Sequence, residues 1–140
     1  MPKRRGEGDN MSTRVDERKP SPVQFIDTAK DLVSHSWRYL PKFPKATRFV
    51  FQTKLSELAI EVYENAVKAN SVFIRKDNEV DKELKRQYLV ASLGALNSLE
   101  GLLAIVQQSH KQDITDYGWT QWGVLINQER ASLIGLLKSI

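Results

Sequence analysis

Residues 40–73 read LPKFPKATRFVFQTKLSELAIEVYENAVKANSVF, and this stretch decides the fold. Its main apolar residues follow one another at steps of 4, 3, 4, 4, 3 and 4, at Phe51, Leu55, Leu58, Val62, Ala66, Ala69 and Phe73. Steps of three and four place side chains on one face of an α-helix. The stretch therefore predicts a long helix from about residue 45 to 73. A second stripe at Ile60, Tyr63 and Val67 fits either a wide core face or a contact with another subunit.

Two prolines separate this helix from the one before it. Pro41 and Pro44 cannot sit inside a regular helix, so the preceding helix should end at Leu40. That helix is predicted from about residue 23, behind a start signal at Ser21 and Pro22. Its inward positions should be Phe25, Ala29, Leu32, Val33, Trp37 and Leu40.

Two further helices are predicted, over residues 80–108 and 113–140. The third helix has its apolar stripe, with Ser92 filling a gap, at Leu89, Leu96, Leu99, Leu103 and Val106. The fourth helix should begin at Asp113 as N-cap and turn inward Trp119, Trp122, Ile126, Leu133, Leu137 and Ile140. No stretch alternates with a period of two. Four long helices joined by short turns predict an all-α fold, an antiparallel up-down four-helix bundle.

The third helix also carries a seam of small residues at Ala91, Gly94, Ser98 and Gly101. A glycine inside a helix costs about 1 kcal/mol relative to alanine, so a close approach by a neighbouring helix is expected here. Between Gln87 and Gln108 the only charged residue is Glu100. The polar residues at the centre of this stretch, Asn97, Ser98 and Glu100, argue against a membrane span.

Composition narrows the class of protein. The chain has 140 residues, a formal charge of +4 and no cysteine, which excludes disulfides, thiolate metal sites and cysteine nucleophiles. Its mean hydropathy of -0.43 argues against a membrane protein, and we expect a cytoplasmic location. Residues 1–22 are predicted to be a disordered basic tail, with six basic and four acidic residues, and residues 23–140 to form the bundle.

No pattern in the sequence indicates catalysis. Glu-x-x-His pairs of di-iron bundles and glycine-rich phosphate loops are absent, and no Ser or Thr has a His-carboxylate pair nearby in the sequence. His35 and His110 lie far apart in the chain, and Glu57, Glu61 and Glu64 are interpreted as a solvated face. Glu100 should reach the bundle edge or pair with a basic residue of a neighbouring chain. We therefore predict a protein that is not an enzyme and has no metal or cofactor.

One stretch of the sequence has an unusual charge distribution. Residues 32–56, LVSHSWRYLPKFPKATRFVFQTKLS, contain no Asp or Glu and carry five cations, at Arg38, Lys42, Lys45, Arg48 and Lys54. Aromatic residues stand among them at Trp37, Tyr39, Phe43, Phe49 and Phe51. Basic groups release counterions from a phosphate backbone, and exposed aromatic rings stack on unpaired bases. The five cations are therefore the predicted nucleic-acid-binding residues, although Trp37 and Phe51 also fit core stripes. Lys82, Lys85 and Arg86 lie among acids and predict a salt-bridged surface.

Residues 36–70, SWRYLPKFPKATRFVFQTKLSELAIEVYENAVKAN, resemble the first half of a known family of small four-helix bundles. The family includes the accessory variability determinant of diversity-generating retroelements and the proteins encoded in intervening sequences of bacterial large-subunit ribosomal RNA. Its members typically have a helix that ends in Y-L-x-x-F-P-K and a long helix that closes with a triplet such as E-A-N. The matching residues here are Tyr39, Leu40, Phe43, Pro44 and Lys45, then Lys68, Ala69 and Asn70.

The resemblance implies a homopentameric barrel of bundles with a positively charged surface. It also implies a non-catalytic accessory protein that binds a reverse transcriptase and its template RNA or cDNA and supports mutagenic retrohoming. Two alternatives stay open: a ribosomal intervening-sequence bundle that binds RNA without a polymerase partner, and a purely structural oligomer. The chain departs from the family pattern at Glu100 and Ala104, where basic residues are common, and at RASLIGLL, residues 130–137, where G-R-x-L-G-G-W is common.

Overall fold

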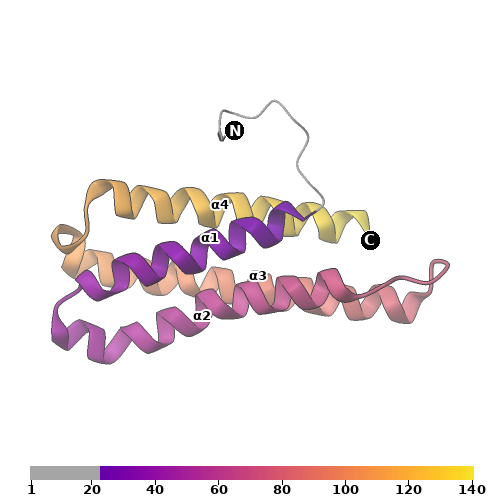
Figure 1. Ribbon diagram of the computed structural model, residues 1–140, viewed down its shortest axis with the longest axis horizontal. Coiled ribbons are helices and arrows are strands. Elements are labelled where there is room, and N and C mark those ends of the chain that lie inside the picture. Colours follow the sequence, from indigo (N-terminus) through magenta and orange to yellow (C-terminus); the bar gives the residue numbers. More distant parts are fainter. Residues whose placement is uncertain (1–22) are drawn as a thin grey trace, which may run out of the picture.

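The computed structural model describes residues 23–140, so the predicted tail, residues 1–22, lies outside the described part of the chain. Short 3-10 turns, η1 (Leu40–Lys42) and η2 (Lys111–Asp113), interrupt a chain of four helices: α1 (Gln24–Tyr39), α2 (Lys45–Ser71), α3 (Glu79–His110) and α4 (Asp116–Ser139). Each helix packs against two neighbours, and α4 returns to α1 (Figure 1). Residues 23–140 contain no strand. The predicted all-α, up-down four-helix bundle is confirmed.

The bundle has two distinct ends (Figure 1). One end holds the α1–α2 junction and the α3–α4 turn, and we call it the first end. The other holds the α2–α3 turn and the end of α4, and we call it the far end. Chain reversal at the far end uses two residues with left-handed backbone, Lys76 (φ 45) and Asp77 (φ 61). There the side chain of Asn78 caps α3 by accepting hydrogen bonds from the amides of Val80 and Asp81.

The predicted core stripes of α2 and α3 are buried. Five positions of the α2 stripe are at most 4% exposed, at Leu55, Leu58, Val62, Ala66 and Ala69. The whole predicted α3 stripe is buried, and Ser92 fills its gap with a hydrogen bond of 2.8 Å to the carbonyl of Val62. Trp122, Ile126 and Leu133 supply the centre of the α4 face. Spacing alone therefore located most of the core.

Three predictions at helix ends are wrong. Trp37 is 81% exposed, because the inward positions at the end of α1 belong to His35 and Ser36. Phe73 is 79% exposed, because α2 ends at Ser71 and the chain has left the helix. The fourth helix begins at Asp116, not after Asp113, because the Thr115 hydroxyl accepts the hydrogen bond from the amide of Gly118 at 3.0 Å.

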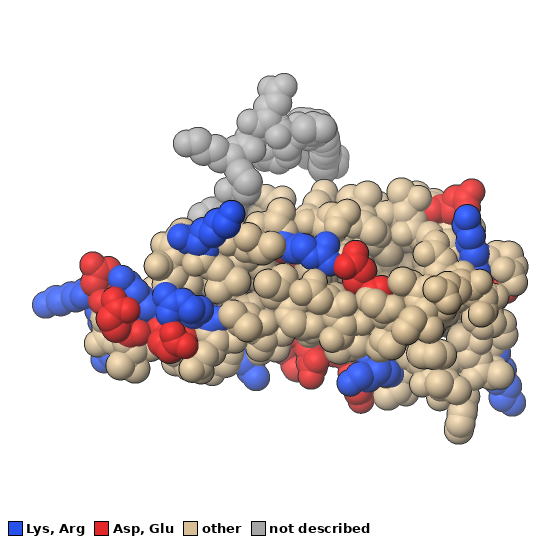
Figure 2. All heavy atoms as spheres, turned by 180° about the vertical axis from the view of Figure 1, so that it is seen from behind, with Lys and Arg blue, Asp and Glu red and all other residues tan. Residues whose placement is uncertain are grey.

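The outer face of α3 is uncharged over most of its length. The seam residues Ala91, Gly94, Ser98 and Gly101 are all exposed, and a Cβ added at either glycine would meet nothing within 4 Å. The bundle itself therefore does not use the seam for close packing. Figure 2 views the molecule from behind Figure 1, where α3 lies behind α2, and shows large areas without charged side chains between the two ends.

One segment, Glu79–Asp113, is long and apolar enough to cross a membrane, with a mean hydropathy of 1.8 over its best window. This is weak evidence, since the core helix of a bundle passes the same test. Only 39% of that window is buried inside the protein. The apolar character of α3 therefore exceeds what the bundle core alone uses.

Candidate nucleic-acid interface

The five predicted cations all lie within the first three turns on either side of the α1–α2 junction. Arg38 ends α1, Lys42 stands in η1, Lys45 opens α2, and Arg48 and Lys54 follow in α2. All are exposed except Arg48, which is half-buried. Not one of them has an ion-pair partner among the described residues. Within residues 23–140 the α1–α2 junction therefore presents five positive charges without ion-pair partners.

The start of α2 adds to this positive potential. Pro44 precedes the helix and offers no side-chain cap, and the first turn contains no acidic residue. The first backbone hydrogen bond of the helix runs from the amide of Arg48 to the carbonyl of Pro44, at 2.9 Å. The amides before it lie at the positive end of the helix dipole. Arg48 also has a buried Nε without a hydrogen-bond partner in residues 23–140.

The five aromatic residues of this region separate into two groups. Phe43 is buried against Trp119, with ring centroids 5.9 Å apart, and Tyr39 and Phe51 are half-buried against the core. Trp37 and Phe49 instead face solvent, with exposed fractions of 81% and 90%. The sequence placed Trp37 in the core, and its exposure brings a second ring into the candidate interface.

Buried polar contacts fix the position of α1 below this surface. The Nε2 of His35 donates a hydrogen bond of 2.8 Å to the carbonyl of Gly118, and the indole of Trp122 donates one of 3.0 Å to Ser36. The His35 ring lies 4.6 Å from Tyr39, centroid to centroid. Burial lowers the pKa of His35, although the bond to Gly118 acts in the opposite direction. The end of α1 therefore rests on α4 through a satisfied, uncharged network.

A second network ties the start of α2 to the α3–α4 turn. The Thr47 hydroxyl lies 2.8 Å from Nε2 of His110, and Nδ1 of His110 lies 2.9 Å from Asp113. The fold thus places a Thr beside a His-carboxylate pair, although none was identified from neighbours in the sequence. The fold brings together residues 63 positions apart, which the search of the linear sequence could not detect. Thr47 is only 8% exposed, so its hydroxyl serves as a link between two turns.

Sequence reasoning also missed the most deeply buried acid. Glu129 of α4 is 0% exposed, and neither carboxyl oxygen has a hydrogen-bond partner among the described residues. Burial raises the pKa of Glu129 to about 8. Its neighbour Arg130 points the other way and pairs with Glu100, so Glu100 reaches the bundle edge as predicted but pairs within its own chain. In the sequence nothing distinguishes Glu129 from the solvated residues beside it.

In residues 75–86, in contrast, three of the five cations are paired. The Nε of Arg75 lies 2.9 Å from Asp81, and the backbone amide of Arg75 donates to the same carboxylate. Arg86 pairs with Glu83 at 2.6 Å. The predicted salt-bridged surface is confirmed for Lys82 and Arg86, whereas Lys85 has no ion-pair partner in the described chain. The pairs of Arg75 with Asp81 and of Lys82 with Asp77 link the α2–α3 turn to the start of α3.

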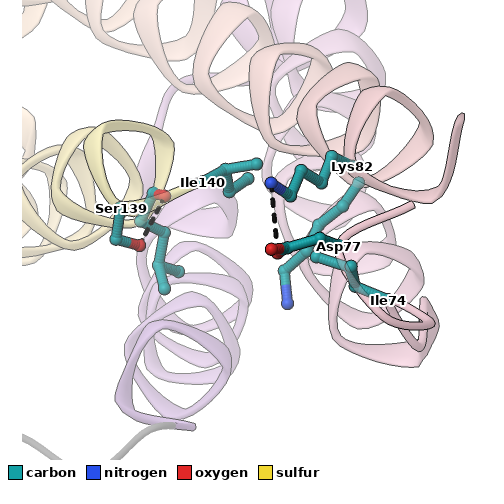
Figure 3. Close-up of a pocket in the computed structure, with 7 residues that line it drawn as sticks. Ile74, Asp77, Lys82, Ser139 and Ile140 are labelled. Carbon is teal, nitrogen blue, oxygen red and sulfur yellow. Dashed lines mark hydrogen bonds and ion pairs between the residues drawn. The ribbon is translucent and has the colours of Figure 1, made fainter. Parts of the chain in front are cut away.

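The far end also contains a pocket of ≈ 370 Å³ (Figure 3). It lies between the α2–α3 turn, the start of α3 and the end of α4, and is lined by Ile74, Asp77, Lys82, Lys85, Leu136, Ser139 and Ile140. Figure 3 shows Lys82 reaching across to Asp77, and the two charged groups are 3.3 Å apart. This internal pairing occupies one of the two lysines that line the pocket. Among the described residues the pocket thus has one lysine without an ion-pair partner, Lys85, against five such cations in residues 32–56.

Comparison with known proteins adds no relative: no family model, no curated protein and no solved structure matches this chain.

Proposed function

We propose that this protein is a non-catalytic, nucleic-acid-binding accessory protein that holds RNA and a reverse transcriptase together. The resemblance of residues 36–70 to the retroelement accessory family suggests the polymerase partner, the template RNA or cDNA and mutagenic retrohoming, and the composition suggests a cytoplasmic location. The four-helix fold agrees with this proposal.

One observation carries the nucleic-acid part. Within the described residues the five cations of residues 32–56 have no ion-pair partner, whereas three of the five cations in residues 75–86 pair with acids of their own chain. Placing like charges close together without compensation opposes folding, and a polyanionic partner removes that repulsion on binding. Arg38, Lys42, Lys45, Arg48 and Lys54 are the residues that would contact phosphates.

A second part of the proposal concerns assembly. Exposed apolar side chains on α3 include Val90 (53%) and Ile105 (54%), and they flank the seam of small residues. Small residues allow the backbones of two helices to approach closely. We propose that the outer face of α3 packs against another copy of this chain in the homopentamer suggested by the family resemblance. Light scattering tests this, and a clean monomer at micromolar concentration contradicts it.

The decisive experiment measures RNA binding against salt concentration. Replacing Lys42, Lys45 and Arg48 with alanine should weaken binding and reduce the slope of log K against log salt by about two units on single-stranded RNA. The matched control replaces Lys82, Lys85 and Arg86, which should leave both quantities unchanged. Equal binding by the first variant and the wild type refutes the interface.

The polymerase partner needs a separate test. The protein should copurify with a reverse transcriptase encoded beside it, in a complex that survives nuclease treatment when the contact is between proteins. If the protein binds RNA and no polymerase copurifies, the intervening-sequence type of RNA-binding bundle is the better assignment.

A further inference from the structure

We infer that the first end binds single-stranded RNA through stacking of unpaired bases on Trp37 and Phe49, in addition to phosphate contacts. This inference rests on the proposed nucleic-acid function and deepens it by naming the form of the ligand. Its starting point is the pair of rings that the core does not use. They are the two most exposed large apolar side chains among residues 23–140, at 90% for Phe49 and 81% for Trp37.

Each ring belongs to a residue that directly adjoins an unpaired cation in the sequence. Trp37 directly precedes Arg38 in the last turn of α1, and Phe49 directly follows Arg48 in the second turn of α2. Neither ring contacts another aromatic ring of the described chain, whereas Tyr39 and Phe43 do. Their faces are thus available to a flat partner at the place where phosphates are attracted.

The pairing of rings with cations favours one ligand over its competitors. A duplex presents phosphates but hides the faces of its bases, so it would use the cations and leave both rings in water. An acidic protein surface would likewise use the charges alone. A single strand offers phosphates and exposed π faces together, and stacking on aromatic side chains is the usual way proteins bind it. A single strand therefore uses every exposed feature of the first end.

The rigid support below the rings suits this role. The end of α1 is fixed to α4 by the bonds of His35 and Ser36, and the start of α2 is fixed to the α3–α4 turn by Thr47. Trp37 and Phe49 thus project from helices whose backbones are held in place. Rigid platforms lose little conformational entropy on binding, which strengthens stacking.

The test compares fluorescein-labelled oligouridine of 20 nucleotides with its duplex with oligoadenylate, using the full chain and fluorescence polarisation. Wild type should bind the single strand more tightly than the duplex. Trp37→Ala and Phe49→Ala should each weaken single-strand binding by roughly 5- to 150-fold, with the salt slope unchanged, and leave duplex binding unchanged. Trp37→Phe should recover much of the lost affinity because it keeps a ring.

Phe73→Ala is the matched control, since Phe73 is 79% exposed but lies at the far end. Circular dichroism checks that every variant folds. Tryptophan fluorescence gives a second readout: Trp122 is 2% exposed and Trp119 is half-buried, so most of the quenching by oligouridine should come from Trp37 and be lost in Trp37→Phe.

Three outcomes overturn the inference. If the cation variant loses binding while both ring variants bind like wild type, the stacking is wrong and the proposed function stands. If wild type binds neither RNA, the proposed function falls as well. If the rings are instead required for binding to phosphatidylserine vesicles and not for oligouridine, the surface belongs to a membrane.

Discussion

The two ends of the bundle use the same residue types for different purposes. Residues 32–56 at the first end hold five cations and no acid, and residues 75–86 at the far end hold five cations and four acids. At the far end, Asp77, Glu79, Asp81 and Glu83 each pair with a basic side chain. Figure 2 shows blue and red side chains mixed at the end that contains the α2–α3 turn.

The comparison shows that a cation's role depends on whether an acidic side chain of the same chain pairs with it. A paired cation stabilises its own turn, and an unpaired cation remains available to a partner. The ends are correspondingly held in different ways. The far end relies on ion pairs, whereas the first end relies on buried hydrogen bonds and aromatic packing around Trp122 and His35. Function at the first end is therefore separable from stability.

The largest expected effect is on stability and comes from Glu129. Its carboxyl group is buried and has no hydrogen-bond partner among the described residues. Its pKa is about 8 in the folded protein and near 4.5 when unfolded. Between these values the folded state keeps the proton and the unfolded state releases it, so rising pH favours unfolding. The free energy of unfolding should fall by about 4 kcal/mol from pH 4.5 to pH 8.

Urea unfolding of wild type and Glu129→Gln at pH 5, 7 and 9 checks this. The variant should lack this fall, so its advantage over wild type should grow with pH and level off above pH 8. Glu100→Gln is the control, because Glu100 is exposed and paired with Arg130. If wild type and Glu129→Gln lose stability in parallel, the carboxyl is not isolated in the core.

The next effect tests the claim that packing holds the first end. A Cβ at position 118 would lie 2.5 Å from Cγ2 of Ile114 and 2.9 Å from Cε1 of Tyr39. Gly118→Ala should therefore lower the free energy of unfolding by about 1–3 kcal/mol. In thermal unfolding, Gly123→Ala in the same helix should instead stabilise by up to about 1 kcal/mol, since nothing lies within 4 Å of its Cβ. Equal effects of the two substitutions would show that Gly118 is not closely packed.

A smaller effect is expected at the far end. Two guanidinium hydrogen bonds and the backbone amide of Arg75 hold the pKa of Asp81 below its usual range. The resulting stability is present above the ordinary pKa of 3.8 and is lost as pH falls through the lower folded value. Asp81→Asn should lower the thermal midpoint by a few degrees and speed amide exchange in residues 74–84.

Amide exchange at the first end should not change in that variant. Glu83→Gln is the control, because its pair with Arg86 is exposed to solvent and contributes little. Faster exchange at both ends in Asp81→Asn would mean that the two ends unfold as one unit. The ends would then differ in their surface charges and not in how they are stabilised.

The sequence predicted the middle of the helices better than their ends. In the middle, every inward position has neighbours on two sides, so apolar spacing determines burial, as at Leu55, Leu58 and Val62. Near the ends, hydrogen bonds compete with hydrophobicity. His35 and Ser36 are buried because Gly118 and Trp122 satisfy them, and Trp37 is left outside.

The candidate site follows the same division. Its cations could be read from the sequence, because a stretch without acids stays uncompensated unless the fold brings acids to it. The contact of Thr47 with His110 could not be predicted from the sequence, since it depends on how the start of α2 and the α3–α4 turn meet in space. The isolation of Glu129 depends likewise on what α4 packs against. Residue spacing predicts which face of a single helix is buried. The Thr47–His110 contact and the burial of Glu129 depend instead on how the helices pack against one another.

The smallest expected effect also tests the comparison most directly, because it places an acid among the cations of residues 32–56. Ala46 is exposed in the first turn of α2, where no acidic residue stands. In Ala46→Glu the new carboxylate should interact with the helix dipole and stabilise the protein by about 0.3–1 kcal/mol. The same charge compensates Lys45 and its neighbours, so RNA affinity should fall several-fold while the thermal midpoint rises. Ala46→Gln should leave RNA affinity unchanged. If Ala46→Glu binds RNA as well as wild type does, phosphates do not approach the start of α2, and its unpaired cations have another purpose.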